Sequence, residues 1–125
     1  MEKNFSLEVV GWNLETARSL GGLIGYMGAI PMKWMNKFFG KADNPNNGKT
    51  SHEWYIWLKE NGIRKACFNI YDYNGEKWHI GGNDVARGSW KEFVETVQKH
   101  MSKYCSNSNE IEFLSDEEMC KKLGY

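Results

Sequence analysis

The sequence predicts a single α+β domain over residues 1–125, in which a small antiparallel sheet packs on helices. The length of 125 residues suits one compact domain. A composition that is 41% hydrophobic and 26% charged is typical of a globular chain. Strand-like residues on both sides of Asn74 and Gly75 predict a central hairpin over 65–80, because this dipeptide favours a two-residue hairpin turn.

The N-terminal part of the chain predicts a strand followed by two helices. Residues 5–11 alternate between apolar and polar types in the manner of a strand. Asn13 is the expected cap of a helix, and apolar residues keep helical spacing over 14–27. Pro31 is expected at the first position of a second, short helix, which ends near Gly40.

Two capping-box patterns, each a Ser or Thr followed three residues later by Glu, predict helices in the middle of the chain. Thr50 and Glu53 form the first pattern, and the helix that they begin is expected to end at Gly62 as its C′ glycine. Ser89 and Glu92 form the second pattern. The residues that follow carry the clearest helical stripe of apolar side chains in the chain.

The C-terminal part predicts one more strand and one more helix. Residues 110–114 have the composition of a strand. Ser115 and Glu118 then repeat the capping-box pattern and predict a last short helix. The hairpin and the helices together complete the predicted α+β domain.

Charge and composition exclude several classes of protein. The 16 basic residues equal the 16 acidic ones, which argues against a protein held on nucleic-acid phosphates. The longest apolar stretch is short and rich in glycine, whereas a membrane span needs roughly 20 apolar residues. The N-terminus does not resemble a signal peptide, so a cytoplasmic protein is expected. The three cysteines have no metal-binding spacing, and neither a metal nor a cofactor is predicted.

Four glycines, Gly21, Gly22, Gly25 and Gly28, fall within the segment expected to be helical. Each costs roughly 1 kcal/mol relative to alanine in a helix, so a compensating interaction is expected. Close helix packing, including packing across a dimer interface, is one explanation. Close approach of a ligand to the backbone is the other.

The segment 81–88 joins the hairpin to the clearest helix and is a candidate phosphate-binding site. Gly81 and Gly82 let a ligand approach the backbone, and the helix N-terminus adds a partial positive charge. Arg87 supplies a guanidinium suited to phosphate oxygens, and Asn83 is a further candidate ligand of the phosphate. The alternative is an ordinary connection in which Asn83 and Asp84 make turn hydrogen bonds.

Aromatic residues of the hairpin are candidates for stacking on a nucleotide base. Tyr71 faces away from the expected core, and Trp78 is near it, so both are candidate platform residues. Core packing is the alternative role for each of them. Arg64, at the foot of the hairpin, is a second candidate cation. For catalysis the sequence offers only an acid–base pair of His79 and Asp84, without a nucleophile motif.

The chain resembles the anti-Thoeris sponges, small phage proteins that sequester cyclic ADP-ribose isomers made by the bacterial Thoeris defence. The resemblance lies in the whole-chain pattern and in the segments 21–35 and 79–90. It implies a non-enzymatic oligomer, located in the host cytoplasm, that binds a signalling nucleotide and releases it intact. No binding residue is transferred from the family to this chain.

Three hypotheses follow for the function. The first is a nucleotide sponge without nucleic-acid or membrane partners. The second is a protein-binding inhibitor of a host defence effector, with aromatic residues at the interface. The third is a small hydrolase that uses His79. A homo-oligomer is also predicted, because segments 14–28 and 32–39 offer more apolar surface than a small sheet needs.

Overall fold

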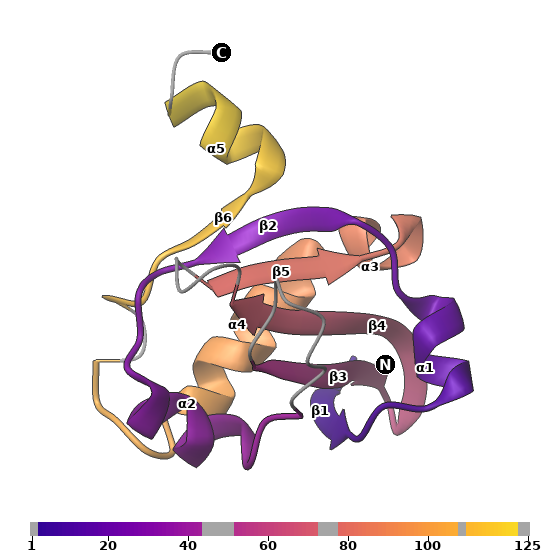
Figure 1. The fold of residues 1–125 in the computed structure, drawn as a ribbon, viewed down its shortest axis with the longest axis horizontal. Helices are drawn as coiled ribbons and strands as arrows, with labels where there is room; N and C mark the ends of the chain where they lie inside the picture. The colour runs from indigo at the N-terminus through magenta and orange to yellow at the C-terminus, as the bar shows by residue number, and fades with distance from the viewer. Residues whose placement is uncertain (1–2, 44–51, 73–77, 108–109, 123–125) are drawn as a thin grey trace.

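The computed structural model describes residues 3–43, 52–72, 78–107 and 110–122, and these form an α+β fold built on one antiparallel sheet (Figure 1). The sheet has six strands in the spatial order β1-β3-β4-β5-β2-β6. The strands are β1 (Phe5–Val10), β2 (Leu23–Met27), β3 (Glu53–Glu60), β4 (Ile63–Asp72), β5 (Trp78–Gly82) and β6 (Phe113–Ser115). The predicted fold class is therefore confirmed.

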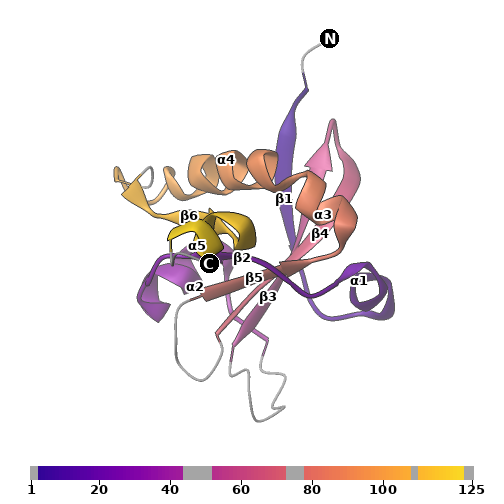
Figure 2. The ribbon, with the colours of Figure 1, turned by 90° about the horizontal axis from the view of Figure 1, so that it is seen from above.

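Helices lie on both faces of this sheet. They are α1 (Leu14–Ser19), α2 (Met32–Phe39), α3 (Asp84–Gly88), α4 (Trp90–Met101) and α5 (Asp116–Lys122). Figure 2 shows α4 along one face, here called the helix face, and α1 on the other, here called the opposite face. On the helix face the ring of Phe93 stacks on Phe68 at 3.8 Å, and both side chains are fully buried. On the opposite face Trp57 donates a hydrogen bond to Thr16 of α1.

The prediction of a helix from Thr50 to Gly62 is wrong, because β3 occupies most of this segment. Thr50 itself lies outside the described residues. Residues 54–58 are buried without a break, since β3 runs between β1 and β4 and both of its faces are covered. Asn61 and Gly62 have positive φ angles of 53° and 82° and connect β3 to β4. This Asn-Gly pair is the hairpin signal that the capping-box interpretation missed.

The prediction of one helix over 14–27 is also wrong beyond its first turns. Asn13 does cap α1, accepting a hydrogen bond from the Thr16 backbone at 2.9 Å, but α1 ends at Ser19 and β2 follows. Two of the four glycines of this segment, Gly21 and Gly25, make room for the close approach of other parts of the chain. A Cβ added at Gly21 would lie 2.8 Å from the Asn83 Cα, and one at Gly25 would lie 2.6 Å from the Trp90 ring.

The other predicted elements are confirmed with small changes. The helix at 32–39 begins after Pro31, which is its N-cap, and ends before Gly40. Strands β4 and β5 pair as the predicted hairpin, although its expected turn at Asn74 and Gly75 lies outside the described residues. Ser89 is the N-cap of α4 but makes no side-chain capping bond.

The last predicted capping box is present at the start of α5. The Ser115 hydroxyl accepts a hydrogen bond from the Glu118 backbone at 3.2 Å. The Glu118 carboxylate in turn accepts one from the Ser115 backbone at 3.3 Å. The preceding strand is shorter than expected and starts at Phe113. None of the helices within the described residues is long and apolar enough to span a membrane.

Candidate functional site

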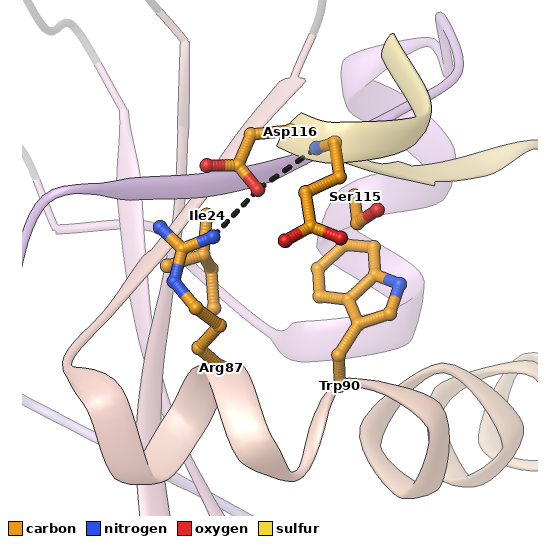
Figure 3. A pocket seen from close by; sticks show the side chains of 6 residues that line it. Ile24, Arg87, Trp90, Ser115 and Asp116 are labelled. Atoms are coloured by element: carbon orange, nitrogen blue, oxygen red, sulfur yellow. Dashed lines mark hydrogen bonds and ion pairs between the residues drawn. The ribbon is translucent and has the colours of Figure 1, made fainter. Parts of the chain in front are cut away.

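A pocket of about 250 Å³ lies where α3, the start of α4, β2 and the β6–α5 junction meet (Figure 3). We call it the Arg87 pocket. Its lining consists of Ile24, Arg87, Trp90, Ser115, Asp116 and Glu117. The residues come from segments far apart in the sequence, because β2 pairs with both β5 and β6 and so places α5 beside α3.

Arg87 reaches this pocket because a local cap starts α3. The Asn83 side chain accepts a hydrogen bond from the Ala86 backbone at 3.1 Å, which fixes the N-terminus of the helix. Arg87 then falls in the last turn of α3 and points toward α5. Asn83 thus makes the turn bond that the alternative interpretation of this segment predicted.

The Arg87 guanidinium forms an ion pair with Asp116 of α5. Nη1 of Arg87 donates to Oδ1 of Asp116 at 2.6 Å, and the same oxygen accepts the Glu117 backbone N–H at 3.0 Å. The hydrogen bond with Arg87 lowers the pKa of Asp116 and raises the pKa of Arg87. The side chains are 44% and 32% exposed, so solvent reaches both partners of the pair.

Trp90 forms the aromatic wall of the pocket. Its indole lies over Gly25, whose missing side chain leaves the space that the ring fills. From the sequence, Trp90 is expected only as one member of the apolar stripe of its helix. The isolated Gly25 in an apolar segment is the signal for such a close approach, once the segment is recognised as a strand.

The glycines of segment 81–88 make room for protein side chains. Gly81 lies beneath the Asn69 side chain, whose Cγ would be 3.2 Å from an added Cβ. Gly82 lies beneath the Ala86 methyl group. Both glycines belong to β5, and neither lines the Arg87 pocket. The side chains that approach the backbone closely at these two glycines are therefore those of Asn69 and Ala86.

Trp78 and Tyr71 lie on opposite faces of the sheet. Trp78 is buried on the helix face, and its indole N–H donates a hydrogen bond to the Ile30 carbonyl at 2.9 Å. Its ring packs against that of Trp54, with 5.3 Å between the ring centroids. Tyr71 lies on the opposite face, with its ring 5.5 Å from that of His79. The structure therefore does not bring these two candidate platform residues together.

A row of polar and aromatic side chains crosses the opposite face of the sheet. Glu53, Tyr71, His79 and Tyr26 are successive cross-strand partners on β3, β4, β5 and β2. Glu53 accepts hydrogen bonds from Asn69 at 2.6 Å and from a neighbouring tyrosine hydroxyl at 3.0 Å. Burial, followed by the charge of Glu53, raises the pKa of Tyr71.

Arg64 lies at the opposite end of β4 from Tyr71. Its guanidinium pairs with Glu8 at 2.9 Å and with Glu15 at 3.2 Å, and it lies over the Trp57 ring at 4.9 Å. It does not line the Arg87 pocket. The two arginines proposed as phosphate ligands therefore belong to separate ion-pair systems.

The candidate acid–base residues are divided between two elements. His79 lies in β5 with the edges of Tyr26 and Tyr71 against its ring, and Asp84 is in the first turn of α3. Within the described part of the chain, no cluster of three or more His, Cys, Asp or Glu side chains could hold a metal ion.

No protein-family model, curated protein or solved structure matches this chain.

Proposed function

We propose that this protein binds and sequesters a small nucleotide in the Arg87 pocket and does not degrade it. The observation that carries the proposal is the presence of a guanidinium and an indole in the lining of one pocket. A guanidinium binds phosphate oxygens through paired hydrogen bonds. An indole face stacks on a base, and such stacking is worth about 1–3 kcal/mol. Arg87 and Trp90 therefore match the two chemical parts of a nucleotide.

The size of the pocket limits what it takes up. Its volume of about 250 Å³ is just below the roughly 300–1,000 Å³ of ordinary small-molecule sites. It suits one phosphate with its nucleoside, or the corresponding part of a larger ligand. A cyclic ADP-ribose isomer, the ligand implied by the family resemblance, would extend beyond the lining residues.

Asp116 acts as a displaceable counterion in this proposal. It forms an ion pair with Arg87, so a phosphate must compete with it for the guanidinium. An exposed ion pair contributes only about 0–1 kcal/mol, so a pyrophosphate, which carries two negative charges in total, can displace the carboxylate. Asp116 would then lower the affinity for nucleotide while Arg87 raises it.

Two variants with opposite effects test the proposal by calorimetry with cyclic ADP-ribose isomers and ADP-ribose. Arg87→Ala is expected to lose about ten- to a hundredfold in affinity, because a charged hydrogen bond is removed. Asp116→Asn is expected to bind more tightly. Lys122→Ala is the matched control, because it breaks another exposed ion pair of α5, with Glu112, outside the pocket. Equal weakening by the Arg87 and Asp116 substitutions would show that the pair only holds α5 in place.

The fate of the bound nucleotide separates sequestration from hydrolysis. We expect mass spectrometry to recover the ligand intact after denaturation of the complex. Multiple turnover that disappears in a His79→Ala variant would instead establish the hydrolase hypothesis.

A second candidate function, inhibition of a host protein, is favoured by exposed apolar side chains at one end of the molecule. Leu14 and Ile63 are 59% and 73% exposed. Leu14 and Ile63 belong to the same end, because their chain neighbours Glu15 and Arg64 form an ion pair. Absence of any nucleotide response, together with loss of effector inhibition in an Ile63→Lys variant, would support this function.

A further inference from the structure

A second pocket, of about 210 Å³, lies between the edge strand β1 and the C-terminal half of α4. We call it the β1–α4 pocket. Its lining consists of Phe5, Ser6 and Leu7 from β1, and Thr96, Lys99, His100 and Lys103 from α4 and the turn after it. It shares no lining residue with the Arg87 pocket.

The charged residues of this second pocket are all basic. Lys99 and Lys103 line it, and no carboxylate is among its lining residues. Within the described residues, neither lysine lies within ion-pair distance of an acidic group. By contrast, Lys65 near the same strand pairs with Glu60 at 3.4 Å. The β1–α4 pocket therefore has positive charge that the described protein groups do not neutralise.

His100 is held in a fixed orientation beside these lysines. Its Nε2 donates a hydrogen bond to the Phe38 carbonyl, since a carbonyl can only accept. Its ring also stacks on Phe39, with 5.9 Å between centroids and 19° between planes. The imidazole thus forms a rigid wall of the pocket.

Phe5 and Leu7 give the pocket an apolar side. Both are partly buried and pack against the hydrophobic core. An anion that fills this space next to the lysines would also contact their apolar surface. A small anion with an attached aromatic or aliphatic group therefore fits the lining better than a free inorganic ion.

We propose that the β1–α4 pocket binds a phosphomonoester with a small apolar group, independently of the Arg87 pocket. The ammonium groups of Lys99 and Lys103 face the phosphate, and the apolar group of the ligand rests on Phe5 and Leu7. Lys99 also lies in the last turn of α4, where cations stabilise a helix through its dipole, and Lys103 lies in the turn after it. A role in helix stability alone predicts a change in melting temperature and no ligand binding.

Phenyl phosphate is the probe, and amide chemical shifts of the full chain are the measurement. We expect saturable shifts at Phe5, Leu7 and His100, and a Kd about tenfold higher in a Lys99→Gln, Lys103→Gln double variant. Lys91→Gln and Arg87→Ala are controls. Lys91 is an exposed lysine of the same helix outside the pocket, so its loss should leave Kd unchanged.

Three results would overturn the proposal. Shifts that do not saturate, or equal weakening by Lys91→Gln, would show that the anion only responds to surface charge. Inorganic phosphate that binds as tightly as phenyl phosphate would exclude the apolar half of the site. An Arg87→Ala variant that loses phenyl phosphate binding would place the probe in the other pocket, whereas unchanged binding keeps the two sites distinct.

Discussion

Gly25→Ala tests the packing that forms the wall of the Arg87 pocket. An added Cβ at this strand position would lie 2.6 Å from Cζ3 of Trp90 and 2.8 Å from the Leu114 carbonyl oxygen. Real Cβ contacts are longer, so at least one neighbour must move. The indole can shift, but the carbonyl belongs to β6, which pairs with β2 at this point.

The expected cost follows from overpacking. An extra methyl group in a packed interior destabilises a protein by about 1–3 kcal/mol. A chain of this length changes its melting temperature by about 3–6 °C for each kcal/mol. We therefore expect a melting temperature about 3–18 °C lower for Gly25→Ala, measured by thermal unfolding followed by circular dichroism.

Gly22→Ala is the matched control, because a Cβ at Gly22 meets no atom within 4 Å. This variant should be neutral or more stable by roughly 0.4–1 kcal/mol, since alanine lowers the entropy of the unfolded chain. A second test replaces Trp90 with leucine, which should recover part of the stability lost in Gly25→Ala. Equal melting temperatures for the two alanine variants would refute the role of Gly25 in seating the indole.

Four further variants extend these tests. Gly81→Ala should displace the Asn69 side chain that lies above it. A change in the NMR chemical shifts of the Asn69 side-chain amide protons would report this displacement. Phe93→Ala should destabilise by about 3–5 kcal/mol in urea unfolding, because the ring is fully buried. Asp116 has a lowered pKa in the folded state, so its contribution to stability is present at neutral pH and is lost as pH falls through that pKa. The melting temperature of Asp116→Asn should therefore fall less in the acidic pH range than that of the unsubstituted protein. The difference should be small because the ion pair is solvent-exposed. Light scattering should show a homo-oligomer, and a mass of 14.5 kDa, that of a single chain, would refute it. If the end of the molecule with the exposed Ile63 is the interface, Ile63→Lys should weaken the oligomer.

Most of the apolar surface from which the sequence predicts a homo-oligomer is buried within the chain. The apolar residues of α2 that motivated it are largely buried within one chain, including Met35, Phe38 and Phe39. Segment 14–28 divides into α1 and β2 and offers no helical interface. The prediction now depends on side chains such as Trp12 and Ile63, which remain exposed.

The sequence alone determined the features that depend on neighbouring residues. Asn13 caps α1 through the backbone three residues later, and Ser115 caps α5 in the same way. The apolar stripe of α4 faces the sheet, with Phe93 and Val97 fully buried. Capping and helical periodicity act within one or two turns, so they can be read without knowing the rest of the fold.

Only the tertiary structure decided the features that depend on distant partners. Residues 53–60 form a strand because β1 and β4 supply hydrogen bonds on both edges and other elements bury both faces. The Arg87 pocket exists because β2 pairs with β6, which brings Asp116 to Arg87 across 29 positions of the chain. The residues around a charged side chain or a capping pattern do not show which distant segment it will contact in the fold. Its role is therefore fixed by packing, which local sequence does not encode.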